Sequence, residues 1–131
     1  MEGTIGEVRM FAGTFAPQNW ALCDGQLMSI AQNHALFSIL GITYGGNGVD
    51  TFALPDLRSR VPVGAGQGPN LSEYDLGEAT GAETVPLTAI AAGSGVASGA
   101  AAVPAPGGSN IQPVLGLNYV FCLYGVYPSR D

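Results

Sequence analysis

Residues 114–124 are predicted to form a strand that is buried on both faces, because apolar residues occupy both sets of alternate positions. One set of alternate positions holds Leu115, Leu117, Tyr119, Phe121 and Leu123; the other holds Gly116, Asn118, Val120, Cys122 and Tyr124. Both sets are largely apolar, which is typical of a strand inside a sheet or between subunits. We therefore expect residues 109–131 to form a buried C-terminal strand segment.

One amphipathic helix is predicted at residues 30–40. Ser29 and Gln32 have the spacing of a capping box, in which each side chain bonds the free backbone N–H of the other residue. Gly41 is a typical helix stop. The apolar residues between them recur at helical spacing: Ala35, Leu36, Ile39 and Leu40.

The remaining pattern predicts short strands and turns. Asp24-Gly25 is a type I′ turn signal between apolar residues 21–23 and 27–28, so a hairpin is expected there. Residues 60–66 read as a short strand whose prolines confine it to an edge or a bulge. The fold class is thus mixed α+β, irregular and β-rich, with one helix. Its expected core is Phe11, Trp20, Leu36, Phe37, Leu40, Phe52, Leu54 and Leu57.

Residues 89–108 form a low-complexity segment dominated by alanine and glycine, and no charged residue occurs between Glu83 and Arg130. A neutral surface loop or a surface covered by other subunits would explain this, and a water-facing monomer would normally interleave charges. We favour subunit contacts. The expected organisation is one domain, 1–131, with a knob (1–88), the Ala/Gly-rich loop (89–108) and the final strand. The candidate interface residues are Ala92, Val96, Val103, Leu117, Tyr119, Phe121 and Leu123.

Charge and composition exclude several classes of protein. The formal net charge is -6 and lysine is absent, whereas a nucleic-acid binder needs a basic face. No apolar run approaches the ~20 residues of a membrane helix. The N-terminus has two glutamates and no basic region, so we expect no signal peptide and synthesis in the cytoplasm. Cys23 and Cys122 lie far apart in apolar contexts and make no disulfide framework, so buried free thiols are expected, and a bridge between them stays open as the alternative.

The candidate chemistry favours a structural role over catalysis. His34 is the single histidine and has no partner at metal-ligand spacing, so neither a metal nor another cofactor is expected. The carboxylates are scattered through turns; a glycosidase pair formed in space stays open as an alternative. Asp56, Arg58 and Arg60 lie between two prolines, where an arginine can bridge a carboxylate and several loop carbonyls. We interpret these three residues as a structural staple of the loops.

Several motifs resemble the phage tail-collar domain, and more narrowly the bacterial proteins called microcystin-dependent-like or tail-collar proteins. The resemblance covers about residues 5–88 and 109–130. Its motifs are "WALCDGQ" (20–26), "LFSILGITYGGNG" (36–48), "TFALPDLRSRVPVG" (51–64) and "NIQPVLGLNYV" (110–120), followed by "PSR" (128–130).

This resemblance implies a compact, irregular α/β knob, often trimeric and intertwined, near the end of a tail fibre. It also implies structural attachment and recognition of cell-surface receptors, often glycans, on a virion, a phage-tail-like particle or an extracellular fibre. No enzymatic activity is implied. In some family members, histidines after the segment "ETVPLT" (83–88) hold a metal ion. Here this segment runs into "AIAAGSGVASGAAAV" without histidine, so the metal site does not carry over.

The expected function is therefore a non-enzymatic, self-assembling structural module, either a trimeric tail-tip knob or the subunit of a homopolymeric filament. The alternative is a lectin-like module that binds a carbohydrate receptor. The candidate ligand-facing aromatic residues for that alternative are Trp20, Tyr44, Tyr74 and Tyr127. Aromatic residues belong more often to cores and interfaces than to sugar platforms.

Overall fold

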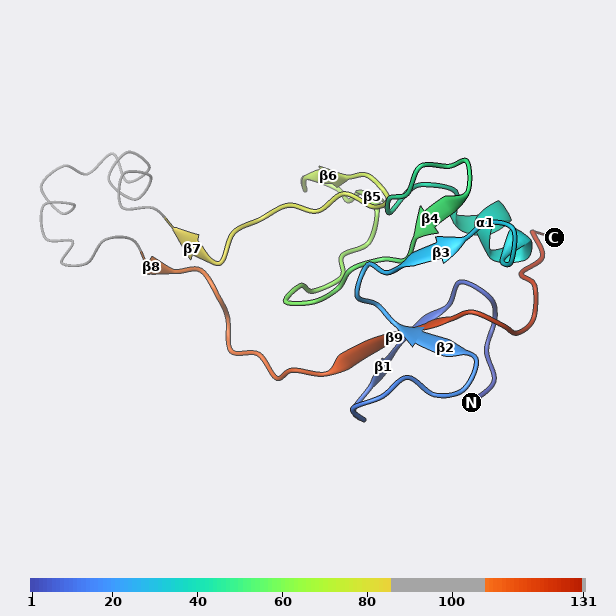
Figure 1. Cartoon of the computed structure of the whole chain (residues 1–131). Coiled ribbons are helices and arrows are strands. Elements are labelled where there is room, and N and C mark those ends of the chain that lie inside the picture. Colours follow the sequence, from blue (N-terminus) through green and yellow to red (C-terminus); the bar gives the residue numbers. More distant parts are fainter. Residues whose placement is uncertain (86–107, 131) are drawn as a thin grey trace, which may run out of the picture. The chain divides into compact units, whose positions relative to one another are not determined.

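The computed structural model describes residues 1–85 and 108–130. The chain forms two compact units, Met1–Glu78 with Leu117–Asp131 and Ala79–Gly116. The structure is β-rich, with several small sheets and one helix in the described part (Figure 1). Apart from Gly108, the predicted Ala/Gly-rich loop lies outside the described residues.

A three-stranded antiparallel sheet organises the first unit. Its strands are β1 (Val8–Phe11), β9 (Asn118–Cys122) and β2 (Trp20–Leu22), with β9 in the middle. In the register, Phe121 of β9 lies opposite Val8 on one side and Ala21 on the other. The alternating pattern predicts this central position for β9, but the strand is shorter than predicted: residues 114–117 and 123–124 lie outside any strand, and residues 114–117 are exposed rather than buried.

Three two-stranded pairs complete the described sheets. In the first unit β3 (Leu27–Ser29) pairs with β4 (Thr51–Ala53), and β5 (Gly66–Gln67) pairs with β6 (Glu73–Tyr74). In the second unit β7 (Thr84–Val85) pairs with β8 (Gly108–Ser109). The strand predicted over residues 60–66 is wrong over residues 60–65, which belong to no strand.

The predicted hairpin around Asp24-Gly25 is also wrong. β2 pairs with β9 and β3 pairs with β4, so the two predicted arms do not pair with each other. The turn instead contacts a distant part of the chain. Asp24 forms an antiparallel bridge with Asp56, and the Gly25 N–H donates to the Pro55 carbonyl over 3.2 Å. The backbone bonds that a hairpin would have made are replaced by the pairing of β2 with β9, the pairing of β3 with β4, and this bridge at the turn.

Helix α1 (His34–Leu40) begins four residues later than predicted. The capping box does not form, because Ser29 is the last residue of β3 and lies opposite Thr51. Asn33 is the N-cap residue, and its side-chain amide donates to the Ser29 carbonyl over 2.9 Å. Gly41 ends the helix as predicted, with its N–H donating to the Phe37 carbonyl.

The main core lies between α1, β4 and one face of the three-stranded sheet. Phe52 and Leu54 are fully buried there, and the ring of Phe37 packs 5.5 Å from that of Phe52. A second buried cluster, made of Trp20, Val120 and Cys122, lies on the opposite face of the sheet. The expected core residues are all found in these two clusters or packed against them.

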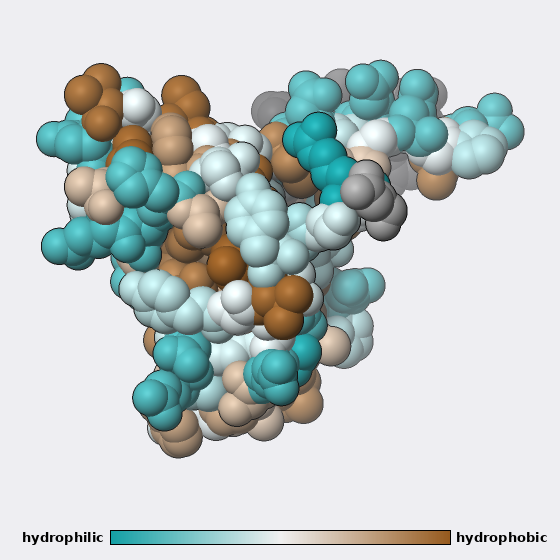
Figure 2. All heavy atoms as spheres, turned by 90° about the vertical axis from the view of Figure 1, so that its right-hand side faces the viewer, coloured by the Kyte–Doolittle hydropathy of each residue, from teal (hydrophilic) through white to brown (hydrophobic). Residues whose placement is uncertain are grey.

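Large hydrophobic side chains also lie on the surface. Figure 2 shows such residues exposed among polar ones on one face of the molecule. Across the described residues they come from strands, the helix and irregular segments: Met10, Leu27, Ile42, Val49, Val61, Val63, Leu71, Leu76, Val114 and Leu115 are examples. No described helix is long and apolar enough to cross a membrane.

Candidate functional site

The loop that carries Asp56 and Arg58 contains a bidentate ion pair. The Nε and Nη2 atoms of Arg58 donate to the two carboxylate oxygens of Asp56 over 2.9 and 2.8 Å, and the Arg58 backbone N–H donates over 3.1 Å. These bonds, above all those from the Arg58 side chain, lower the pKa of Asp56 to about 2. Both side chains are solvent-exposed, and the pair closes a turn only two residues long.

Backbone hydrogen bonds hold this loop against the segment that follows β2. The Leu54 N–H donates to the Gln26 carbonyl over 3.0 Å, and the Leu57 N–H donates to the Cys23 carbonyl over 2.9 Å. Arg60 is exposed, and its backbone N–H donates to the Leu57 carbonyl. The side chain of Arg58 thus contacts its own turn, and its role in locking several loops together stays a prediction, as does that of Arg60.

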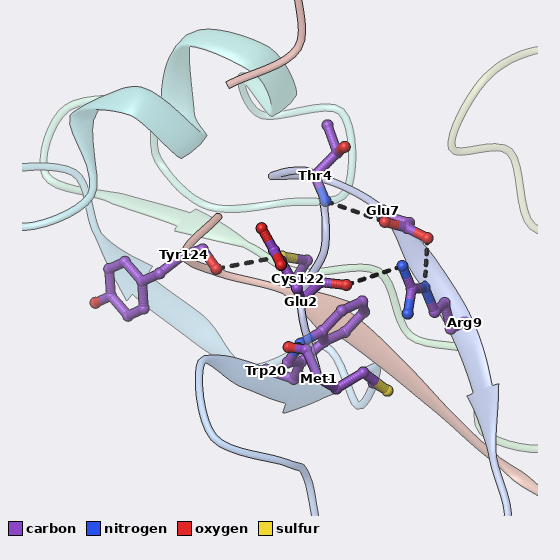
Figure 3. Close-up of polar contacts among 8 residues, drawn as sticks. All are labelled: Met1, Glu2, Thr4, Glu7, Arg9, Trp20, Cys122 and Tyr124. Atoms are coloured by element: carbon purple, nitrogen blue, oxygen red, sulfur yellow. Dashed lines mark hydrogen bonds and ion pairs between the residues drawn. The ribbon is translucent and has the colours of Figure 1, made fainter. Parts of the chain in front are cut away.

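A second polar cluster, which the sequence patterns did not predict, surrounds Trp20. The guanidinium of Arg9 lies 5.1 Å from the Trp20 ring, donates to the Glu2 carbonyl over 3.0 Å and pairs with Glu7 (Figure 3). The Trp20 indole N–H donates to the Met1 carbonyl over 3.0 Å. The hydrogen bond from Arg9 lowers the pKa of Glu7. The available signal was the Glu-x-Arg spacing, which places both side chains on one face of a strand.

Trp20 is therefore not a ligand-facing residue. It is only 5% exposed, because the ring packs against Val120 and Cys122 and is covered by Arg9 and the N-terminal residues. This corrects the interpretation of Trp20 as a sugar platform and agrees with its place in the expected core.

The other three candidate aromatic residues lie in separate places. Tyr44 is half-buried and packs against the main core, and Tyr74 is half-buried on β6. Tyr127 is exposed and shares a 2.8 Å hydrogen bond with the Ser38 hydroxyl of α1. Tyr124, also exposed, donates to the Asn33 side chain over 3.4 Å. The C-terminal tail thus carries two exposed tyrosines beside α1.

The predicted interface residues divide into three groups. Phe121 is 2% exposed and belongs to the core of its own chain, so its assignment to a subunit contact is corrected. Tyr119 and Leu123 are half-buried against the same core, whereas Leu117 is exposed. A residue in the middle strand of a sheet is covered by its own neighbours, which the alternation alone did not reveal. Ala92, Val96 and Val103 lie outside the described residues.

The two cysteines are free and buried. Burial is the main cause that raises the pKa of Cys23 to about 12, and burial also raises the pKa of the Cys122 thiol. Such thiols stay protonated near neutral pH and are poor nucleophiles. Within residues 1–85 and 108–130, no three His, Cys, Asp or Glu side chains gather in a way that could hold a metal ion.

Of the comparisons with known proteins, the one with family models agrees with the sequence motifs. No curated protein matches the chain. A family model does match, over somewhat less than half of the chain, and it includes the segment of Trp20, helix α1 and the Asp56–Arg58 turn. Residues 6–62 match the Phage Tail Collar Domain family, which confirms the predicted resemblance over these residues, whereas the resemblance of the motifs after residue 62 stays a prediction.

Proposed function

We propose that this chain is a self-assembling structural module of a phage-tail-like fibre, whose copies associate through apolar surface. The family match supports the structural role in a tail fibre and the association with a virion or a similar particle. Self-assembly is the finer claim, and it rests on the surface of the described residues.

The observation that carries this proposal is the exposure of large apolar side chains near the uncharged stretch of the sequence. Leu115 is 84% exposed, and Val114 beside it is also exposed. No charged residue lies between Glu83 and Arg130. Exposed apolar side chains in a segment without charged residues are typical of surfaces that contact another protein.

The free energy gained by burying such side chains stabilises an assembly only if several segments take part. Full burial of one valine or leucine side chain contributes about 1.5–3 kcal/mol. The pairs Val61/Val63 and Val114/Leu115 are each more than half exposed, so hiding all four contributes roughly 4–8 kcal/mol. Association of two proteins costs about 4–15 kcal/mol in lost freedom. A stable assembly therefore needs both pairs, or equivalent contacts, rather than either pair alone.

A charge placed at one of these positions tests the proposal. Leu115→Asp should dissociate the assembly, because a carboxylate would have to be buried without a partner. Gln112→Asp is the matched control, since it adds the same charge at a nearby exposed polar position. Light scattering on both variants measures the molar mass. Equal masses for both variants and the wild-type protein would contradict a contact at Leu115.

Receptor attachment is a second candidate function, favoured by the exposed Tyr124 and Tyr127 beside α1. Exposed aromatic rings have an apolar face and, in tyrosine, a polar tip, which suits a sugar ring with its hydroxyl groups. A glycan array should then give defined hits that Tyr127→Ala removes. An array without hits, or with hits that survive Tyr127→Ala, would argue against this role for the tail.

A further inference from the structure

We propose that residues 61–64 of one copy pair as an antiparallel strand with the free edge of β1 in a second copy. The inference rests on the proposed self-assembly and specifies two surfaces that meet. Both surfaces belong to the first compact unit, in which the two segments of one copy are not paired with each other.

Among residues 1–85 and 108–130, no strand pairs with the outer edge of β1, and this edge carries apolar side chains. Strand β1 is an outer strand of its sheet, and the Cys122 N–H of β9 donates to the Glu7 carbonyl over 2.9 Å. Backbone groups of successive residues alternate between the two edges of a strand, so those of Val8 and Met10 point outward. Their side chains are 41% and 65% exposed. An edge of this kind is a template for pairing with another chain.

Residues 61–64 have the sequence of a strand but no partner. The sequence predicts a strand here, yet the described structure pairs none of these residues, and no backbone hydrogen bond within the described chain involves them. Val61 and Val63 are 63% and 61% exposed. A segment with β-branched residues in this state has both backbone groups and apolar side chains available for a partner.

The two segments match in one antiparallel register, with Val61 opposite Met10 and Val63 opposite Val8. In this register the N–H groups of both valines point toward β1. Pro62, which has no N–H, falls opposite Arg9, where the backbone groups of both strands point away from the shared edge. The apolar side chains of the two segments then share one face of the extended sheet.

A second copy of the chain is the occupant that these features favour. The chain itself supplies both an uncharged segment with two exposed valines and an edge with exposed Val8 and Met10. Since the two surfaces differ, each copy offers one of each, which is a head-to-tail contact. Repetition of such a contact closes a ring or continues into a filament, as expected of a fibre module.

Cross-linking tests the register directly. Met10→Cys and Val61→Cys are placed in differently tagged copies and co-expressed, and the purified protein is treated with a short bismaleimide. The native Cys23 and Cys122 are buried and should react little. We expect a cross-linked peptide that joins positions 10 and 61. Val49→Cys, also at an exposed valine, replaces Val61→Cys in the control. Equal cross-linking of both pairs, or none at 10–61, would overturn the register.

A matched pair of proline variants separates this inference from self-assembly itself. Val63→Pro removes an N–H that should face β1, whereas Gly64→Pro removes one that should face away. Val63→Pro should lower the assembled fraction at least tenfold in light scattering and leave the thermal unfolding of the single chain unchanged. Gly64→Pro should leave the assembled fraction unchanged. An oligomeric wild-type protein whose assembly survives Val63→Pro refutes the pairing alone. A wild-type protein that is monomeric refutes the proposed function as well.

Discussion

Replacing Phe121 with alanine should destabilise the folded chain by about 3–5 kcal/mol, the usual cost of removing a buried phenylalanine side chain. Phe121 is in the middle strand, is almost completely buried and belongs to the main core with Leu36 and Phe52. The substitution removes apolar contacts and leaves a cavity that the neighbours fill only in part. This loss is a large fraction of the ~5–15 kcal/mol that typically stabilises a domain.

Urea unfolding, followed by the fluorescence of Trp20, measures this loss. The change in the free energy of unfolding should not depend on protein concentration, because Phe121 packs within its own chain. Leu117→Ala on the same segment is the control; it is exposed and should change the free energy of unfolding of a single copy by less than about 0.5 kcal/mol. A Phe121→Ala protein with unchanged unfolding, or with a loss seen only at high concentration, would refute the assignment of Phe121 to the core.

Three further predictions concern the cysteines, the Asp56–Arg58 pair and a glycine turn. A thiol reagent at about pH 8 should label neither Cys23 nor Cys122 in the folded protein and both after denaturation; rapid labelling of the folded protein would contradict their burial. The lowered pKa of Asp56 means that its pairing stabilises the fold above the ordinary pKa of about 4 and that this effect is lost as the pH falls toward 2. Asp56→Asn should therefore lower the Tm at about pH 6 and not near pH 2, and an equal difference at both pH values would argue against it. Gly46→Ala should destabilise by more than about 1 kcal/mol in thermal unfolding, because its φ is +96° and a Cβ would lie 2.4 Å from the Phe52 Cα; Gly116→Ala, where a Cβ meets nothing within 4 Å, is the control, and equal effects would contradict this.

Local patterns predicted the features that depend on side-chain polarity. The core residues Leu36, Leu40 and Phe52 could be chosen because an apolar residue in a periodic pattern needs a buried face, whatever its partner. The family could be recognised because its motifs combine turn residues and apolar residues at fixed positions. The end of the helix at Gly41 also follows from local chemistry, since glycine tolerates the positive φ found there.

Features that depend on a choice between partners could not be predicted in this way. Ser29 could cap a helix or end a strand, and its pairing opposite Thr51 decided the outcome. Asp24 could turn a hairpin or bridge another segment, and Asp56 provided the bridge. Trp20 could belong to the core or face a ligand, and its contacts with Arg9 and with the Met1 carbonyl decided the outcome. In each case a residue distant in the sequence contacts the backbone or side-chain groups. The local sequence does not indicate which residue that is.

The molar mass of the purified wild-type protein, measured by light scattering over a range of concentrations and followed by negative-stain imaging, tests the central claim most directly. The exposed apolar segments predict a mass that is a multiple of the monomer mass, seen in images as discrete particles or as filaments. A protein that stays monomeric at every concentration, with its apolar segments in water, would contradict the claim that this chain is a self-assembling module.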